Sequence, residues 1–452
     1  RVIRLETVES EQRENPVAGL FDGLLAEISG TALVRRVGRV VETRRGLVQV
    51  EGLQSAAIGD RVLIQSRDGA AGGEVLRLAP RLCFVLPDSS GDGMTIGDRV
   101  ELLGRADIAP DDSWIGRIVD PTGQPLDGKP LLRGAVSRGL RAAAPAAASR
   151  RRLGERLSTG VAVFDTLLPL VRGQRIGLFA GSGVGKSSLL GRFARGVTAD
   201  VVVIALVGER GRELREFTER VLGPSGMARS VVVTATSDQS PLVRRMCALT
   251  AMAVAEHFRD KGLHVLLLVD SVTRFAEAHR EVALAGGEDA TLRGYPPSLT
   301  RAIMGLAERA GPGPEGAGDI TAVFSVLVAG SDMEEPVADI LRGVLDGHVI
   351  LDRRIAERGR FPAIDLLRSV SRSLPEAATE KENALIGEAR RLLGAYDRAE
   401  LMIQAGLYAA GSDPVIDRAI KVWPLLDGFL AEAAPASGVE GSFERLRVCL
   451  AG

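Results

Sequence analysis

The feature that most constrains the fold of this chain is a glycine-rich segment between an apolar run and a helical pattern. The segment, AGSGVGKSS, covers residues 180–188. It follows RIGLF and precedes LLGRFARGV, which is the strand–turn–helix context of a phosphate-binding loop. The first glycine of the usual eight-residue pattern is replaced by Ala180. We interpret the segment as a P-loop, because an intact GKS at a strand-to-helix junction rarely arises by chance.

The residue types in this loop suit a polyphosphate. Glycines allow backbone N–H groups to curve around the phosphates without a clash from a Cβ atom, and the helix N-terminus adds a positive dipole end. Lys186 is expected to neutralise the β- and γ-phosphates, and the Ser187 hydroxyl to hold Mg²⁺. The predicted ATP site therefore contains Ala180, Gly181, Ser182, Gly183, Val184, Gly185, Lys186, Ser187 and Ser188.

Two carboxylates follow apolar runs that we predict to be strands. Asp270 ends HVLLLVD, so it is expected at the carboxyl edge of the sheet, where it supports the Mg²⁺ shell. Glu209 follows VVVIAL and is expected at the same edge, where a carboxylate can orient and deprotonate an attacking water. A turn residue in a charged helix cap is the competing interpretation for Glu209, and spacing alone leaves both open.

The pattern of apolar and polar residues changes along the chain. Short β-branched runs separated by Gly, Asp and Ser turns between residues 33 and 103 predict a small barrel or sandwich. From about Trp114, strand-like and helical runs alternate, which predicts an α/β fold with a mostly parallel sheet covered by helices. We expect a helical stub at 1–29, a β-barrel domain at 30–105, a P-loop ATPase core at 106–375 and a C-terminal helical domain at 376–452.

The stretch RAAAPAAASRRR at residues 141–152 has low complexity. It is interpreted as a linker into the nucleotide core, in preference to an exposed basic arm. The chain starts with Arg1 and not with Met, so we expect that an N-terminal piece is missing.

Composition excludes several kinds of protein and site. The 57 Lys and Arg residues balance 58 Asp and Glu residues, which argues against a protein whose main task is to coat nucleic acid. The three cysteines lie far apart without a CxxC pair, so a disulfide framework is not expected. No two of the four histidines have the short spacing of a zinc site. No run approaches the roughly 18 apolar residues that a membrane-spanning helix needs.

The segment PAIDLLRSVS at residues 362–371 matches the signature Pro-Ala-Ile-Asp-x₃-Ser-x-Ser of the ATP synthase α/β-subunit superfamily. The segments GRIVDPTGQPLDG, GERGRE and GYPPS are also similar to that superfamily. The resemblance implies a RecA-like P-loop ATPase core between an N-terminal β-barrel and a C-terminal helical domain.

Within the superfamily, the chain most resembles the type III export ATPases, and especially the flagellar group. The segments AGSGVGKS, REVALAGGE, LDGHVILDR and GSDPVIDRAI carry this likeness. A synthase β-subunit more typically shows GGAGVGKT, and a synthase α-subunit usually has Gln where this chain has Glu209. The resemblance therefore favours a catalytic chain with Glu209 as the base.

The same resemblance implies roles for residues outside the P-loop. Arg372 corresponds to the arginine finger that reaches the γ-phosphate bound by a neighbouring subunit. Arg210 resembles an active-site arginine that senses the phosphate or positions Glu209. Phe361 stands where the family packs an aromatic ring on adenine, although an ordinary core phenylalanine is the competing interpretation. Tyr408 is a weaker candidate for the other face of the base.

The function implied is that of a hexameric ATPase of flagellar type III protein export, which couples ATP hydrolysis to chaperone release and substrate export during flagellum assembly. The implied location is the cytoplasm, peripheral at the inner face of the bacterial inner membrane. The implied partners are further copies in a homohexamer, a regulator or stator protein, a coiled-coil stalk protein in the pore, export chaperones and export-gate membrane proteins.

Four alternatives compete with this hypothesis. They are a virulence-type secretion ATPase, a catalytic subunit of a rotary ATP synthase, an RNA translocase with the same core, and a scaffold that binds ATP without turnover. An RNA-binding barrel needs aromatic residues for stacking, and residues 30–105 contain only Phe84, so no nucleic-acid partner is expected. A scaffold is expected to have lost Lys186, Glu209, Asp270 or Arg372, and all four are present.

Overall fold

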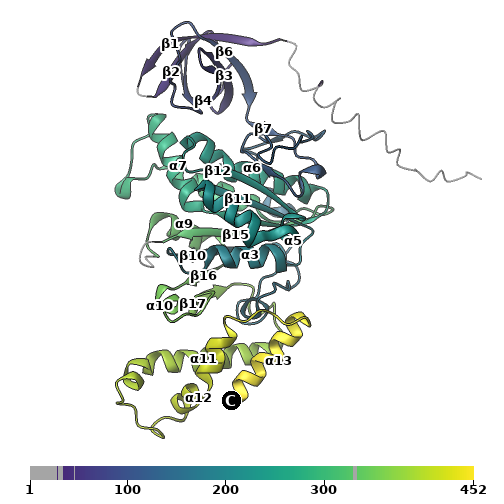
Figure 1. The fold of residues 1–452 in the computed structure, drawn as a ribbon, viewed down its shortest axis with the longest axis vertical. Helices are drawn as coiled ribbons and strands as arrows, with labels where there is room; N and C mark the ends of the chain where they lie inside the picture. The colour runs from purple at the N-terminus through teal and green to yellow at the C-terminus, as the bar shows by residue number, and fades with distance from the viewer. Residues whose placement is uncertain (1–27, 29–33, 45, 329–332) are drawn as a thin grey trace, which may run out of the picture.

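The computed structural model describes residue 28 and residues 34–44, 46–328 and 333–452. The helical stub expected at 1–29 lies outside the described residues, except for Ile28, which is helical. Three parts follow one another along the long axis: a barrel, a layered α/β core and a helical end (Figure 1). No helix in the described ranges is long and apolar enough to cross a bilayer.

The first part is a closed barrel of six strands in the order β1-β2-β5-β4-β3-β6. Its strands are β1 (Arg36–Arg44), β2 (Leu47–Glu51), β3 (Asp60–Ser66), β4 (Gly69–Ala79), β5 (Leu82–Pro87) and β6 (Arg99–Arg105). Burial alternates along β2 and β5, and the inward positions, Val50 and Val85 among them, fill the interior with valine and isoleucine side chains. Closure pairs every strand on both sides, so the predicted barrel is confirmed and has no open edge.

The second part is a nine-stranded sheet with the order β17-β16-β10-β15-β13-β11-β12-β8, and β14 pairs with β15 outside this path. Its strands are β8 (Ile118–Val119), β10 (Arg175–Ala180), β11 (Val201–Glu209), β12 (Ser230–Thr236), β13 (His264–Asp270), β14 (Gly311–Pro312), β15 (Asp319–Leu327), β16 (Gly347–Leu351) and β17 (Ile364–Ser371). The strands from β16 to β8 pair in parallel, whereas β17 is antiparallel. Every residue of β11 and β13 is buried, as expected for parallel strands covered on both faces.

Helices cover both faces of this sheet (Figure 1). The longer ones are α3 (Lys186–Gly196), α6 (Pro241–Asp260), α7 (Val272–Ala285), α8 (Ser298–Arg309) and α9 (Pro336–Val344). Alternate residues of β11 serve opposite cores: Val202 and Ile204 pack with α3, and Val203 and Ala205 pack with α6 and α7. This alternation is the period of two expected for a strand between two layers. The strand β10 lies between β15 and β16, so its carboxyl end opens in the middle of the sheet.

Shorter elements connect these layers. They are β7 (Asp107–Ile108), β9 (Arg138–Gly139), α2 (Ala162–Asp165), α4 (Gly211–Glu216), a π-helical turn (Phe217–Leu222), α5 (Gly223–Met227) and α10 (Arg353–Glu357), with 3₁₀ turns at Asp112–Trp114, Ala147–Ser149 and Leu292–Gly294.

The third part consists of α11 (Glu380–Gln404), α12 (Pro414–Phe429) and α13 (Gly438–Ala451). A capping box fixes the start of α11, because Thr379 and Glu382 each accept a hydrogen bond from the other's backbone N–H. The last helix, α13, begins at Gly438 and packs on α12 and α11. Tyr396 and Trp423 stack between α11 and α12, with ring centroids 4.5 Å apart.

The linker at 141–152 is docked on the core. The Arg150 Nη1 atom donates to the backbone oxygen of Ala310 at 3.1 Å, and Arg151 pairs with Asp319 at 2.6 Å. Arg141 pairs with Glu74 of the barrel strand β4. Arg141, Arg150 and Arg151 therefore hold this stretch against its neighbours, which favours the linker interpretation over an exposed arm.

Candidate nucleotide site

The glycine-rich loop lies where β10 ends and α3 begins. Gly183 and Gly185 have φ values of 77° and 91°, in the left-handed region that glycine adopts without a Cβ clash. Gly185 is also the N-cap residue of α3, and no side chain caps the first N–H groups of this helix. Those N–H groups are oriented out of the helix and are available to an anion.

A cavity of about 680 Å³ borders this loop. It is enclosed by the P-loop, the end of β11, the start of α7 and the segment before β17. The residues that sequence reasoning placed in an ATP site and that line this cavity are Gly181, Ser182, Gly183, Gly185, Lys186, Ser187, Ser188, Glu209, Arg210 and Phe361. The side chains of Ala180 and Val184 do not line it, because both are buried in the hydrophobic core and leave only their backbone to the loop.

Lys186 and Asp270 meet at the base of the loop. The Lys186 Nζ atom forms an ion pair with Oδ1 of Asp270, and the Ser325 hydroxyl donates to the same oxygen at 2.8 Å. Asp270 is only 3% exposed and lies at the carboxyl end of β13. The structure thus brings together an ammonium and a carboxylate that are 84 residues apart in the sequence.

Glu209 lies at the carboxyl end of β11, beside the same cavity, and is 9% exposed. Burial raises the pKa of its carboxyl group above the ordinary value, and a hydrogen bond with Glu213 raises it further, whereas Arg274 and Lys186 oppose the shift. The same hydrogen bond lowers the pKa of Glu213. A buried carboxyl group with a raised pKa at the edge of a cavity is suited to accept a proton from water.

Arg274 and Glu213 are two charged residues among those of this cavity that sequence reasoning missed. Arg274 of α7 forms an ion pair with Glu209 and donates to the backbone oxygen of Gly208 at 3.0 Å. The signal that points to both is their spacing. Arg274 is four residues beyond Asp270, in the first turn of the helix that follows β13, and Glu213 is four residues beyond Glu209. Side chains in such first turns lie over the ends of the strands that precede them.

Three aromatic or basic candidates lie at different distances from the loop. Phe361 is 45% exposed and lines the cavity, with its ring 3.2 Å from the place that a Cβ on Gly185 would take. Arg372 follows β17, is exposed, and does not line the cavity of its own chain; its Nη2 atom donates to the backbone oxygen of Arg342 at 3.3 Å. Tyr408 is also outside the cavity, since its hydroxyl contacts Asp413 and Asp417.

Comparison with family models matches two stretches of the chain. Residues 160–371 match the nucleotide-binding domain of the ATP synthase alpha/beta family. Residues 378–446 match the T3SS EscN ATPase C-terminal domain. The first match contains the glycine-rich loop, Glu209, Arg274, Asp270 and Phe361, and the second covers most of the C-terminal helices.

Individual relatives extend the likeness over nearly the whole chain. The flagellum-specific ATP synthase of Agrobacterium fabrum is 44% identical over 92% of this chain and 88% of its own length. The type 3 secretion system ATPase of Xanthomonas euvesicatoria is 42% identical over 93% of this chain and 95% of its own length. Among solved structures, the assembled ATPase EscN of enteropathogenic E. coli, in complex with its central stalk EscO, is 37% identical and has a TM-score of 0.83, covering 91% of this chain and 100% of that chain.

Proposed function

The chain belongs to the ATP synthase alpha/beta family, with the flagellum-specific and type 3 secretion ATPases, and from this premise we propose that it hydrolyses ATP as the motor of flagellar protein export. One observation carries the proposal: Glu209 and the P-loop face one cavity, with Lys186 and Asp270 paired at its base. A proton acceptor (Glu209), a phosphate-binding loop and the ammonium group of Lys186 therefore surround one space large enough for a nucleotide.

In this proposal the N–H groups at the start of α3 hold the β- and γ-phosphates, and Lys186 neutralises part of their charge. Glu209 orients a water molecule and accepts its proton while the water oxygen bonds to the γ-phosphorus. The bond between that phosphorus and the bridging oxygen of ADP breaks, so the products are ADP and inorganic phosphate. Arg274 positions Glu209 through their ion pair.

The chemistry of the residues at the P-loop fits Mg²⁺. Mg²⁺ in nucleotide sites takes one or two protein oxygens and completes its shell with phosphate oxygens and water. The exposed Ser187 hydroxyl and the Asp270 carboxylate offer oxygens of this kind, and the described residues contain no cluster of three His, Cys, Asp or Glu that would form an all-protein metal site. Bound with ATP, Mg²⁺ supplies positive charge at the β- and γ-phosphate oxygens.

We further propose that the active form is a homohexamer and that Arg372 acts in trans. Arg372 is exposed and lies outside the cavity of its own chain, so it is available to the cavity of a neighbouring copy. A guanidinium there can bridge the charge that spreads over the γ-phosphate oxygens during transfer. The related EscN is described as assembled, which supports a multi-subunit form.

The proposed partners follow from the family. The complex of EscN with its central stalk EscO supports a stalk protein in the pore of this ring as well. A regulator or stator protein, export chaperones and export-gate membrane proteins are proposed on the resemblance alone. So are chaperone release and a place in the cytoplasm against the inner membrane.

A complementation experiment tests the core of this proposal. Glu209→Gln lacks the base but keeps the finger, and Arg372→Ala lacks the finger but keeps the base. Each variant alone is expected to be almost inactive, whereas a mixture regains part of the wild-type rate, because a Glu209→Gln subunit can place Arg372 in an intact neighbouring cavity. The ATPase rate is measured against protein concentration, with the mass of the assembly determined in parallel. A mixture that stays inactive contradicts the trans finger. So does a wild-type ATPase rate per subunit that does not change when the assembly dissociates on dilution.

A type 3 secretion ATPase is the second candidate, because the Xanthomonas protein and EscN are about as similar to this chain as the flagellar relatives are. Complementation of a flagellar ATPase deletion by this chain, scored as motility, distinguishes the two roles.

A further inference from the structure

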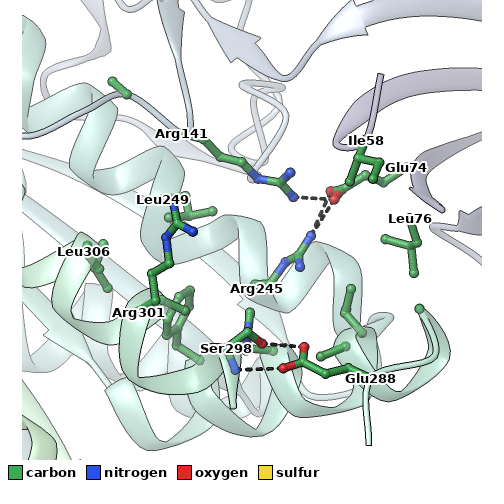
Figure 2. Close-up of a pocket in the computed structure, with 18 of the residues that line it drawn as sticks. Ile58, Glu74, Leu76, Arg141, Arg245, Leu249, Glu288, Ser298, Arg301 and Leu306 are labelled. Carbon is green, nitrogen blue, oxygen red and sulfur yellow. Dashed lines mark hydrogen bonds and ion pairs between the residues drawn. The ribbon is translucent and has the colours of Figure 1, made fainter. Parts of the chain in front are cut away.

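A second large cavity, of about 660 Å³, lies between the barrel and the nucleotide-binding core (Figure 2). Its walls come from β4 of the barrel, from the linker around Arg141 and from the helices α6, α7 and α8. None of its lining residues lines the P-loop cavity. The volume lies in the range of sites that enclose small organic molecules.

Part of the lining is apolar and rigid. Leu249, Phe275, Val282 and Leu306 contribute side chains from three helices, and Leu76 adds one from the barrel. Phe275 and Leu306 are nearly fully buried and belong to the core of the α/β part. A planar or branched apolar group in the cavity would therefore contact side chains that are already held in place by packing.

An ionic cluster, in which Glu74 and Arg245 are buried and Arg141 is exposed, forms another wall. Figure 2 shows Arg141 and Arg245 converging on the carboxylate of Glu74. The Nη2 atom of Arg245 lies 2.8 Å from each Glu74 oxygen, but its Nε atom is buried and has no hydrogen-bond partner among the described residues. Arg245 is only 7% exposed. One carboxylate therefore serves two guanidinium groups, and one buried N–H remains unused.

Among the other groups of the lining, the positive charge of Arg301 offsets the negative charge of Glu288, so the surplus of positive charge remains. Glu288 is engaged by Ser298, whose backbone N–H and hydroxyl donate to it at 2.7 and 2.6 Å. Burial and the neighbouring Arg245 lower the pKa of His279 to about 4, so this ring is neutral at pH 7. Arg301 also lines the cavity, and it has no ion pair or hydrogen bond within the described part of the chain. An anion entering the cavity would neutralise positive charge that the protein itself leaves unpaired.

We propose that this cavity is a binding site for a small organic anion with an apolar body. The carboxylate, sulfonate or phosphate of the ligand is held by Arg301, beside the positive charge that Arg141 and Arg245 leave after pairing with Glu74, and its body lies on Leu249, Phe275 and Leu306. The inference does not depend on the proposed ATPase activity, because it rests on residues that take no part in the P-loop cavity.

Two fluorescent probes that share the same aromatic rings distinguish the contribution of charge to binding from that of apolar contact. Anilinonaphthalene sulfonate carries a sulfonate, and N-phenyl-1-naphthylamine is its neutral counterpart. Both are titrated into the whole 452-residue chain with ADP present, so that the P-loop cavity is not available to them. The sulfonate probe is expected to bind at least about tenfold more tightly than the neutral one, a difference of about 1.4 kcal/mol.

Two variants locate the binding. A Cβ on Gly305 meets no atom within 4 Å, so Gly305→Phe places a ring in open space within the cavity and is expected to weaken both probes about tenfold or more. Arg301→Gln removes a charge that has no partner and is expected to weaken the sulfonate probe alone. Arg391→Gln, an exposed change on α11, is the control and leaves both affinities unchanged. Thermal unfolding and circular dichroism verify that each variant is folded.

Three results would overturn the proposal. In the first, Gly305→Phe leaves the affinity for the sulfonate probe unchanged. In the second, Arg301→Gln affects both probes equally. In the third, the sulfonate probe is displaced when the protein concentration is raised to the range in which the chains assemble. This result would mean that a neighbouring copy fills the cavity.

Discussion

The P-loop cavity and the cavity under the barrel have almost the same volume but are built in opposite ways. The P-loop cavity, of about 680 Å³, is formed by one continuous loop and by the carboxyl ends of neighbouring parallel strands. The cavity of about 660 Å³ under the barrel is formed by side chains from the barrel, the linker and three helices. In the first the backbone defines the site, whereas in the second the docking of one domain on another defines it.

The two cavities also differ in how their charges are paired. Lys186 with Asp270, and Arg274 with Glu209, form one-to-one pairs at the P-loop. Under the barrel, Glu74 faces two arginines. Substitutions at the P-loop or at the proposed finger should therefore change turnover, and substitutions under the barrel should change stability and binding. The predictions below test this division, from the largest expected effect to the smallest.

Arg372→Ala is expected to lower kcat by about 10³–10⁵, because the transition-state charge at the γ-phosphate loses its guanidinium. If Arg372 serves the cavity of a neighbouring copy, as proposed, the apparent affinity for ATP should change little. Steady-state ATPase kinetics measure both quantities. Arg447→Ala, which breaks an exposed pair on α13, serves as the control and should retain wild-type kinetics. A loss below tenfold for Arg372→Ala would exclude its role as a finger.

Glu209→Gln is expected to lower kcat by about 10²–10⁴, because the amide has the same shape but cannot accept the proton of water. Nucleotide binding, measured by calorimetry with ADP, should persist. The control is Glu219→Gln, an exposed residue that pairs with Arg215 nearby in the sequence. If Glu209→Gln retained most of the activity, the proton would have to go to another group, and Glu213 would be the next candidate.

Glu74→Ala is expected to destabilise the protein by about 3–5 kcal/mol, because Arg245 would remain buried with no carboxylate. Urea unfolding followed by circular dichroism measures the loss. Glu357→Ala removes an exposed carboxylate paired with Arg353 on α10 and should cost less than about 1 kcal/mol. If the two variants were equally stable, the ionic cluster would not hold the barrel on the core.

Phe361→Ala is expected to weaken ATP binding by about 1–3 kcal/mol, the range measured for a base stacked on an aromatic ring. The effect should appear mainly in KM, because the ring contacts the base and not the reacting phosphate. Phe361→Tyr keeps an aromatic face and should restore the wild-type KM. An unchanged KM in Phe361→Ala would mean that the ring packs only against Gly185.

The smallest expected effect, and the most specific to Glu209, is on the pH dependence of kcat. Glu209 must be ionised to accept a proton, and burial raises its pKa, so activity should fall on acidification at a higher pH than an ordinary glutamate would give. Arg274→Gln removes a contact that lowers this pKa, and it should shift the acid limb to higher pH. Glu213→Gln removes a contact that raises it, and it should shift the limb to lower pH. Shifts in the same direction would contradict the opposing roles of these two neighbours.

The sequence by itself determined the parts of the site that local structure fixes. A glycine-rich turn between a strand and a helix places Lys186 and Ser187 at a helix N-terminus whatever the rest of the chain does. The carboxyl ends of parallel strands meet at one edge, so Glu209 and Asp270 were expected at the same crevice, and the structure brings both to the P-loop. Short β-branched runs between turn residues predicted the strands of the first domain as a barrel or a sandwich, the family resemblance favoured the barrel, and the structure closes it.

Only the tertiary structure decided which distant side chains meet. The pairing of Arg274 with Glu209, the docking of the linker arginines, and the exposure of Arg372 outside its own cavity depend on how helices and the barrel pack on the sheet. Periodicity tells which face of an element is buried, but it does not tell which residue of another element lies opposite that face. The cavity under the barrel, whose walls extend from Ile58 to Arg309, follows from that packing and has no local signature in the sequence.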